Sequence, residues 1–340
     1  MYRPIFFTYF TSAKKRRTSL TGFFGMRMNK LASIAILVTL SLNLLGQQDP
    51  KLSQNMFLIP VFNPGAMGQS DKICALASFR NQWAGFPEAP VVTTFTAHAP
   101  FNLLGRSHGA GINLMNDNVA LNNDLFASLS YSYKIDIGGG LLGIGLSLGL
   151  ANHSFDPSNL NGADVIDITG DDAIPQNAAS MFGFDAGLGA FYSTDKLYFG
   201  VSTTHLNQTS FDFPEELAEA RLIRHYYLNG GYNIQLSNPM LELMPSFMLQ
   251  TDGRDNHIYL NTNLRYNKRF WGGVSYSVGG AVSALFGIEL LNGIRVGYSY
   301  DIELSPLFKY SSGSHEITVR YCFDLSLDKS PQKYESIRFL

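Results

Sequence analysis

A strict two-residue alternation of apolar and polar side chains is the feature that most constrains how this chain can fold. The segment "IYLNTNLRYN", residues 258–267, sets Ile258 and Leu260 against Asn261 and Asn263. Successive side chains of a β-strand point to opposite faces of its sheet. The segment therefore predicts a strand with one apolar and one strongly polar face. The question that follows is whether the apolar face meets a protein core or lipid.

The same alternation recurs in about fourteen segments, an even number that suits an antiparallel bacterial barrel. Most of them approach the ~10 residues of a membrane-spanning strand, whereas strands of soluble proteins average about 5–6 residues. Pro245 lies inside one segment, and because proline cannot donate a ladder hydrogen bond, we expect a bulge or kink there. The predicted strands are residues 72–80, 90–100, 107–116, 122–137, 139–153, 181–193, 196–206, 224–237, 239–251, 256–268, 269–278, 280–291, 293–302 and 314–325.

The links between these predicted strands differ in length in a regular way. Short links such as "GG" at 138–139 and "KR" at 268–269 follow even-numbered strands, whereas most links after odd-numbered strands are longer, such as 80–90 and 302–314. Outer-membrane barrels have short periplasmic turns and long external loops. We therefore predict that the turns, and with them both chain termini, lie in the periplasm.

The composition favours lipid over a protein core. Only 15% of the residues are charged, against about 25% in a typical soluble domain. Aromatic pairs such as Phe270–Trp271 stand near strand ends, as in the girdles of membrane barrels. The sequence thus predicts an all-β fold, a transmembrane antiparallel β-barrel, with a soluble periplasmic β-protein as the rival. The formal net charge of −2 gives no indication of nucleic-acid binding.

The N-terminal region has the layout of a secretory signal peptide. Lys30 supplies a basic start, residues 31–45 form an apolar run, and small Gly46 follows. An uncleaved anchor helix is the alternative, although the run is short for one. Either Met1 or Met28 can be the true start. We predict Sec-dependent export to the outer membrane. The predicted regions are an N-terminal extension with the signal peptide (1–46), a periplasmic lead-in (47–71), the barrel (72–325) and a periplasmic C-terminal tail (326–340).

Two glycine motifs match functional patterns by their letters alone. "GLSLG" at 145–149 fits the G-x-S-x-G nucleophile elbow, but strand alternation continues through it. "GGGLLG" at 138–143 matches G-x-G-x-x-G, but it lies on a hairpin turn. The seven histidines form no close metal pair, and the acidic loop 152–180 matches no EF-hand, with calcium binding there left as an alternative. We predict no enzymatic activity, no cofactor and no metal site.

The two cysteines stand at opposite ends of the predicted barrel sequence. Cys74 is early in the first strand and Cys322 is late in the last, and these strands are neighbours if the sheet closes. Alternation turns both side chains inward, near the periplasmic end. The alternatives are a disulfide across the closing seam and two free thiols, because the periplasm is oxidising but the register is not fixed by the sequence.

Two N-terminal segments carry a family resemblance. "QDPKLSQNMFLIPVFNPGAMG" (48–68) and "RNQWAGFPEAPVVT" (80–93) resemble the PorP/SprF family of type IX secretion system outer-membrane proteins. The sequence departs from the family pattern at Gly65, where alanine is usual, and at Glu88. The matching residues, which are the candidates for interaction, are Gln48, Asp49, Pro50, Ser53, Gln54, Met56, Asn63, Pro64, Gly68, Arg80, Gln82, Trp83, Gly85, Ala89 and Pro90.

The resemblance implies a non-enzymatic barrel of the type IX secretion and gliding machinery that assists export or surface anchoring of a secreted protein. It implies as partners the periplasmic ring, peptidoglycan-binding lipoproteins, and the C-terminal domain of an adhesin-like cargo, beside outer-membrane lipid and without nucleic acid. The alternative is a porin-like or hydrophobic-compound channel. The apolar lead-in, with "NPGAMG" at 63–68 as a strand-breaking turn, is expected at the periplasmic mouth or partly inside the lumen.

Overall fold

The computed structural model describes residues 49–156, 178–211, 220–290 and 293–324. The predicted signal peptide, Gln48 and the C-terminal tail lie outside this range. The spanning strands are β1 (Ile73–Asn81), β2 (Val91–Leu103), β3 (Arg106–Val119), β4 (Asn122–Ile137), β5 (Gly140–Phe155), β6 (Ala179–Ser193), β7 (Leu197–Thr204), β10 (His225–Tyr232), β12 (Leu241–Thr251), β13 (Asn256–Tyr266), β14 (Phe270–Ser277), β15 (Ala281–Glu289), β16 (Ile294–Glu303) and β17 (Ser314–Phe323). Shorter elements are β8 (Ser210–Phe211), β9 (Ala220–Arg221), β11 (Ile234–Gln235) and η4 (Pro306–Lys309).

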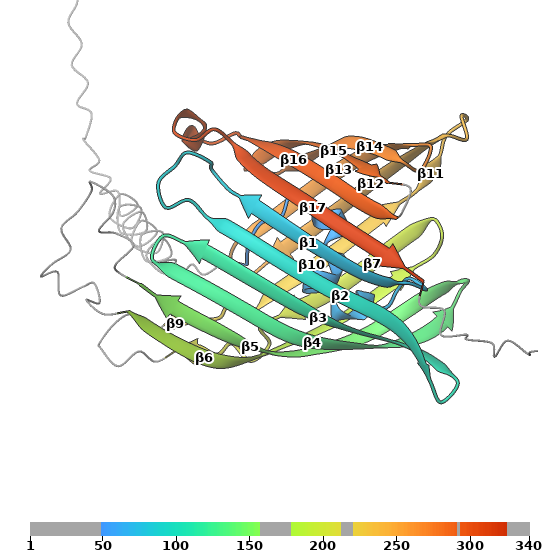
Figure 1. Ribbon diagram of the computed structural model, residues 1–340, viewed down its shortest axis with the longest axis horizontal. Helices are drawn as coiled ribbons and strands as arrows, with labels where there is room; N and C mark the ends of the chain where they lie inside the picture. The colour runs from blue at the N-terminus through green and yellow to red at the C-terminus, as the bar shows by residue number, and fades with distance from the viewer. Residues whose placement is uncertain (1–48, 157–177, 212–219, 291–292, 325–340) are drawn as a thin grey trace, which may run out of the picture. The chain divides into compact units, whose positions relative to one another are not determined.

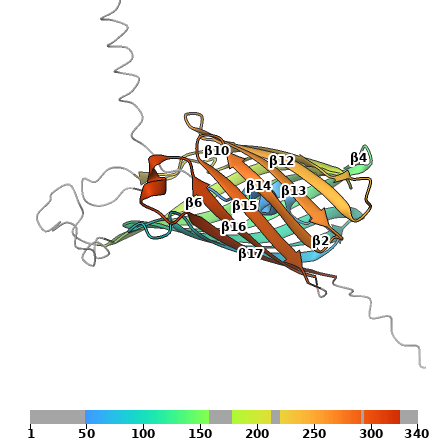
Figure 2. The ribbon, with the colours of Figure 1, turned by 90° about the horizontal axis from the view of Figure 1, so that it is seen from above.

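These strands form one closed antiparallel barrel (Figures 1 and 2). Each spanning strand pairs with the next spanning strand in the sequence, including β7 with β10 and β10 with β12. β1 pairs with β17, which closes the barrel. The two-residue β11 continues the line of β10, so the barrel has 14 spanning strands and the predicted fold is confirmed. Among the described residues, no helix is long and apolar enough to cross a membrane.

The burial pattern of β13 answers the question raised by its sequence. Leu260 and Leu264 are 50% and 42% exposed, whereas Asn261 and Asn263 are 3% and 1% exposed. The apolar face is therefore on the outside of the barrel and the polar face lines the inside. This is the reverse of a soluble sheet, and it is what a barrel surrounded by hydrocarbon requires.

Pro245 interrupts a hydrogen-bonded ladder without the predicted bulge, and the alternative of a kink stays a prediction. Within β12 it stands opposite Thr262 of β13, in a continuous ladder. On the other side, the ladder from β12 to β10 ends at Gly231 and resumes in β11 at Ile234, with the same register on both sides of the gap. The missing proline donor thus interrupts one ladder without inserting a residue.

The barrel has a long-loop end and a short-turn end. The long-loop end carries the loops 82–90 and 304–313, and the short-turn end carries the turns 104–105 and 138–139. In Figure 1 the loop between β1 and β2 and the turn η4 lie at the left, and the turn between β2 and β3 lies at the lower right. The rule of long links after odd-numbered strands has an exception after β3, where only residues 120–121 intervene.

Residues 49–69, hereafter the plug, run through the inside of the barrel (Figures 1 and 2, blue). They form three short turns, η1 (Asn55–Phe57), α2 (Ile59–Phe62) and η2 (Pro64–Ala66). Leu58 and Met67 are fully buried. The segment that the sequence placed at the mouth or partly in the lumen therefore lies inside the lumen (Figures 1 and 2).

The plug starts at the long-loop end and finishes at the short-turn end. The backbone oxygen of Asp49 accepts a 3.2 Å hydrogen bond from Gln250 at the end of β12. Gln69 donates to the backbone oxygen of Leu141, next to the turn 138–139, at 2.8 Å. The first described residue thus lies at the opposite end of the barrel from Phe323, whereas the loop lengths predict both termini at one end. The polar side chains of the lumen wall hold the lead-in there, and strand alternation does not report them.

Candidate functional site: the plug and its seat in the lumen

The turn formers of the plug shape it through contacts within its own sequence. The side chain of Asn63 accepts a 2.9 Å hydrogen bond from the backbone N–H of Gly65, and Pro64 opens η2 with its fixed φ. Gly68 has a φ of +61°, which L side chains rarely adopt. The "NPGAMG" motif therefore forms a compact turn that ends just before β1.

The wall carries glycines where the plug backbone presses against it. A Cβ on Gly145 would lie 2.3 Å from the carbonyl carbon of Pro64, and a Cβ on Gly143 would lie 2.1 Å from the oxygen of Gly65. No real Cβ makes such contacts, so these two positions of β5 require glycine. Gly65 itself has no room for a side chain, because its Cβ would lie 2.7 Å from the oxygen of Gly143. The departure from alanine at Gly65 thus matches the closeness of the two backbones.

A buried ion cluster holds the first part of the plug. Arg80 on β1 forms ion pairs with Asp301 at 2.7 Å and Glu316 at 3.4 Å, and all three side chains are at most 5% exposed. The hydroxyl of Ser53 donates to Asp301 at 2.6 Å, and the backbone N–H of Ser53 donates to Glu316 at 2.7 Å. The backbone N–H of Gln54 donates to the same carboxylate at 3.1 Å. Ser53 and Gln54 of the first motif segment and Arg80 of the second therefore belong to one network of ion pairs and hydrogen bonds.

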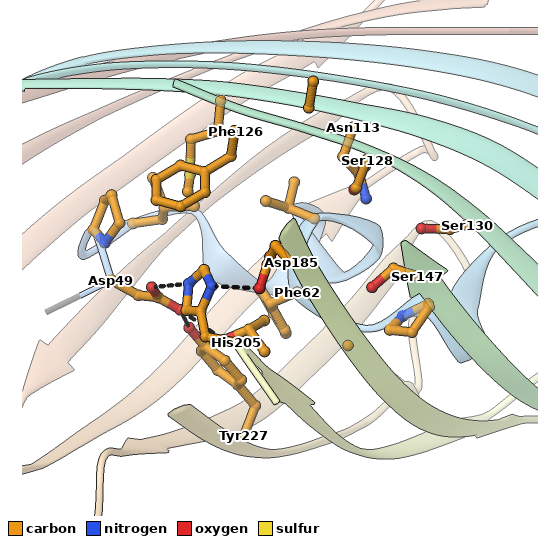
Figure 3. Close-up of a pocket in the computed structure, with 18 of the residues that line it drawn as sticks. Asp49, Phe62, Asn113, Phe126, Ser128, Ser130, Ser147, Asp185, His205 and Tyr227 are labelled. Carbon is orange, nitrogen blue, oxygen red and sulfur yellow. Dashed lines mark hydrogen bonds and ion pairs between the residues drawn. The ribbon is translucent and has the colours of Figure 1, made fainter. Parts of the chain in front are cut away.

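A second cluster surrounds Asp49 (Figure 3). The carboxylate of Asp49 lies 2.8 Å from Nε2 of His205, whose Nδ1 lies 3.0 Å from Asp185. Because both ring nitrogens face carboxylates, both donate and His205 is an imidazolium. Tyr227 and Thr204 also donate to Asp49. Burial raises the pKa of Asp49, but His205 and His225 outweigh it and hold this pKa below its usual value.

The last part of the plug is held by neutral acceptors and one cation. Lys134 on β4 donates to the backbone oxygen of Gly65 at 2.9 Å and to the side-chain oxygen of Gln69 at 2.7 Å. The backbone N–H of Gly68 donates to Nδ1 of His98 at 3.2 Å. The plug is therefore bonded to the wall along its whole length.

The structure sorts the predicted motif residues into two groups. The first group lies in the plug or holds it: Asp49, Pro50, Ser53, Gln54, Met56, Asn63, Pro64, Gly68 and Arg80. The second group lies in the loop 82–90 at the long-loop end: Gln82, Trp83, Gly85, Ala89 and Pro90. Gln48 is outside the described residues. Their role as interaction residues stays a prediction.

The loop 82–90 is tied to the last strands of the barrel. The indole N–H of Trp83 donates to Glu303 at 3.0 Å, and its backbone N–H donates to the hydroxyl of Ser314 at 3.0 Å. Ala84 exchanges backbone hydrogen bonds with Gly313 and Ser312 at 2.8 and 2.7 Å. The tip of the loop, from Gly85 to Glu88, is exposed.

The wall partners of the plug were missed by the sequence analysis. Asp301, Glu316, Asp185 and His205 were not singled out as site residues. A signal was available, because ionisable residues on the inward faces of strands in a chain with 15% charged residues are unusual. The sequence does not say which of them meet, since that depends on the barrel register.

Cys74 and Cys322 form a disulfide across the closing seam. The two residues stand directly opposite each other in the β1–β17 ladder, with their Cα atoms 4.1 Å apart. The bond joins positions that are 248 residues apart in sequence. Its formation in the cell remains a prediction.

The two glycine motifs lie in a strand and in a hairpin turn. "GLSLG" lies within the uninterrupted strand β5, so it lacks the strand-to-helix turn of a nucleophile elbow. "GGGLLG" spans the turn between β4 and β5. Within the described ranges, no three His, Cys, Asp or Glu side chains gather as a metal site. Most of the acidic loop lies outside those ranges.

Comparisons with known proteins identify a family. The profile described as "Type IX secretion system membrane protein PorP/SprF" matches residues 44–321. No curated protein matches the chain.

Several solved structures are similar in fold at low sequence identity. Omp33 of Acinetobacter baumannii shares 7% identity, with 75% of this chain and 100% of that chain covered and a TM-score of 0.44. The toluene transporter TbuX of Ralstonia pickettii shares 10% identity, with coverage of 76% and 91% and a TM-score of 0.42. A mutant of the Rh. blastica porin shares 10% identity, with coverage of 74% and 99% and a TM-score of 0.31.

Proposed function

Because the chain belongs to the type IX secretion system PorP/SprF membrane protein family, we propose that it is a non-enzymatic outer-membrane component of that machinery. In this role it assists the export or the surface anchoring of a cognate secreted protein. The family match over residues 44–321 carries the proposal, and the plugged barrel supports it. A barrel whose lumen is filled by its own chain offers its loops and mouths to partners rather than an open pore.

The surfaces available for such partners lie at the two ends of the barrel. At the long-loop end, the tip of loop 82–90 and the neighbouring turn η4 expose Phe86, Phe308 and Tyr310 at 41%, 61% and 70%. We propose that the motif residues of this loop present it to the secreted cargo. The short-turn end faces the periplasm in this orientation, so the periplasmic ring and the peptidoglycan-binding lipoproteins would bind there.

The experiment is a deletion and capture study in the native bacterium. Deleting the gene should remove one or more secreted proteins from the cell surface while general type IX export persists, and the tagged barrel should co-purify with secretion components. As a matched pair, Phe86→Ser alters the exposed loop and Val274→Ser alters the lipid-facing wall. Loss of surface cargo with the first variant only supports the loop; an unchanged surface proteome after deletion, with no secretion component captured, refutes the role.

The second candidate is a transport channel. It predicts steady solute flux through the purified barrel in liposomes. The plug argues against it, because residues 49–69 fill the lumen and are hydrogen-bonded to the wall at both ends. Swelling of liposomes at a rate comparable to an open porin would favour transport over the secretion role.

A further inference from the structure

Two cations in the short-turn half of the lumen, Lys134 and Arg320, form no ion pair with any carboxylate of the described residues. Lys134 is 3% exposed, and it donates hydrogen bonds to the neutral oxygens of Gly65 and Gln69. Arg320 on β17 donates to the disulfide sulfurs of Cys322 at 3.2 Å and Cys74 at 3.5 Å. Sulfur is a weak acceptor, so these contacts do not balance the charge of a guanidinium.

The acidic residues nearby are already engaged. Glu289 forms an ion pair with Arg295 at 2.6 Å, and Asp324 forms one with Lys72 at 3.1 Å. Among the described residues, Arg320 has no ion pair. Because a cation removed from bulk water is costly without an anionic partner, this part of the lumen favours an anion.

A cavity of about 240 Å³ lies beside Arg320, between residues 56–69 of the plug and the wall. Three polar residues of the wall line it: Arg320, His98 and Thr96. The remainder of its lining is mostly apolar and comes from both the plug and the wall. These residues include Met56, Phe57, Ile59, Pro60, Leu76 and Phe191.

Two of these residues, His98 and Thr96, carry a donor for which the described residues provide no acceptor. His98 accepts the Gly68 N–H at Nδ1, so in the neutral ring the hydrogen is on Nε2, which is free to donate. The hydroxyl of Thr96 is buried, with the residue 1% exposed, and has no hydrogen-bond partner within the described structure. A ligand in the cavity would supply the acceptor that this hydroxyl lacks.

We propose that this cavity binds a carboxylate carried at the end of a short apolar chain. Arg320 and the Nε2–H of His98 hold the carboxylate, the Thr96 hydroxyl completes the donor set, and the apolar chain lies along Phe57 and Phe191. A guanidinium suits a carboxylate because it donates through a planar pair of N–H groups. The apolar lining selects against a bare inorganic anion, which would leave that surface unsatisfied.

Two sources supply this chemistry, a peptide C-terminus with an apolar last residue and a small organic acid. The half-buried Gln69 and Ser70, which lie toward the short-turn end, are among the residues that line the cavity. A ligand would therefore enter from the periplasm in the proposed orientation. The inference does not depend on the export role, because cargo deletion and ligand binding are measured separately.

The test uses the full chain in lipid nanodiscs and isothermal titration with hexanoate, and empty nanodiscs as the blank. Hexanoate should bind, and hexanamide and acetate should each bind at least tenfold more weakly, because one lacks the charge and the other the apolar chain. The tripeptide acetyl-Gly-Phe-Leu, free and C-terminally amidated, tests the peptide source. Stronger binding of the free peptide than of hexanoate assigns the site to peptides, and the reverse order assigns it to small acids.

Three variants locate the site. Arg320→Gln should weaken hexanoate binding at least tenfold, whereas Arg254→Gln, at an exposed position between β12 and β13 at the long-loop end, should leave it within about twofold. Thr96→Leu fills the cavity from β2 and should abolish binding without touching any charge, which keeps the test valid if Arg320→Gln fails to fold. No binding of hexanoate or of the free peptide to the wild type, equal binding of hexanoate and hexanamide, or unchanged binding in both Arg320→Gln and Thr96→Leu overturns the proposal.

Discussion

Arg80 shows how a single side chain can hold a plug in a barrel. Its guanidinium faces two carboxylates from β16 and β17, and the plug reaches the same carboxylates through Ser53 and Gln54. Each charge is buried, so each depends on the others for a counter-charge. Asp49 of the plug forms a second buried ion pair with His205 of the wall, also toward the long-loop end. In both clusters the plug binds to charges that are already fixed in the wall.

Replacing Arg80 by methionine should lower the free energy of unfolding by about 3–5 kcal/mol, because Asp301 and Glu316 would be left buried without a cation. Denaturant unfolding in detergent, followed by tryptophan fluorescence, measures the change. Arg295→Gln is the control: its pair with Glu289 is 42% and 29% exposed, and such pairs contribute about 1 kcal/mol or less. Equal losses in the two variants would contradict the importance of the cluster.

Asp49→Asn should have a pH-dependent effect. Because the folded-state pKa of Asp49 is held below its ordinary value of 3.8, its stabilisation is complete above pH 3.8 and is lost as the pH falls further. The wild type should therefore exceed the variant by about 2 kcal/mol at pH 7, as expected for hydrogen bonds to charged groups, and the gap should narrow below pH 3.8.

Unfolding curves of both proteins at several pH values give this difference, with Asp71→Asn at an exposed position as the control. A gap between the wild type and Asp49→Asn that is the same at every pH would show that the charge of Asp49 is not the cause.

At the scale of elements, the fit between β5 and η2 decides how closely the plug approaches the wall. The row of small residues in β5 allows backbone to meet backbone, and the hydrogen bonds of Lys134 and Asn63 then fix the turn. The seam between β1 and β17 is the other element-level feature. It closes the sheet next to the point where the plug becomes β1, and the disulfide lies in that seam.

Gly145→Val should push the plug away from β5, since the new side chain would overlap the backbone of Pro64. We expect a rise in ion conductance of the purified barrel in planar bilayers and faster proteolysis within residues 49–69. Gly272→Val is the matched control, because its Cβ would meet only one atom, at 3.4 Å. If Gly145→Val stays as closed as the control, the glycine row does not seat the plug.

The seam disulfide should be present in protein purified from the envelope. Intact mass spectrometry should show a gain of the two thiol hydrogens on reduction, and free thiols before reduction would end the prediction. Cys74→Ser should lower the free energy of unfolding by roughly 5 kcal/mol on the chain-entropy argument, because the bond closes a loop of 248 residues. The double variant with Cys322→Ser should be no less stable than the single one.

Across the barrel as a whole, the two ends of the plug contact groups of different charge. The lead-in passes from the long-loop end to the short-turn end before it turns into β1. The carboxylate-rich clusters around Arg80 and Asp49 lie toward the first end, whereas Lys134 and Arg320 lie toward the second. The buried charges named here therefore differ in sign between the two halves of the lumen.

This path is testable in intact cells with a membrane-impermeant maleimide. Lys51→Cys lies by a cavity at the long-loop end and should be labelled from outside, whereas Gln69→Cys should be labelled only after the envelope is permeabilised. Both variants are made in a Cys74→Ser, Cys322→Ser background, so that no native thiol competes for the label. Labelling of Gln69→Cys alone in intact cells would reverse the orientation derived from the loop lengths.

Local pattern was enough for the sequence to predict the barrel, its strands and the plug's turn. Alternation in "IYLNTNLRYN" predicts a strand with a lipid-facing side because each side chain's direction is fixed by its neighbours along one strand. The turn at Asn63 and Pro64 is equally local. Pro245 was misjudged in detail because a missing donor can be absorbed by one ladder while the other stays continuous, and only the paired strands show which one.

The tertiary structure alone decided where the lead-in lies and what holds it. The meeting of Ser53 with Glu316, and of Asp49 with His205, joins residues 263 and 156 positions apart in sequence. Such contacts depend on barrel closure and on the register of all the intervening strands, because each register shift would turn a different side chain into the lumen. The sequence therefore determined the wall, and only the closed barrel determined its contents.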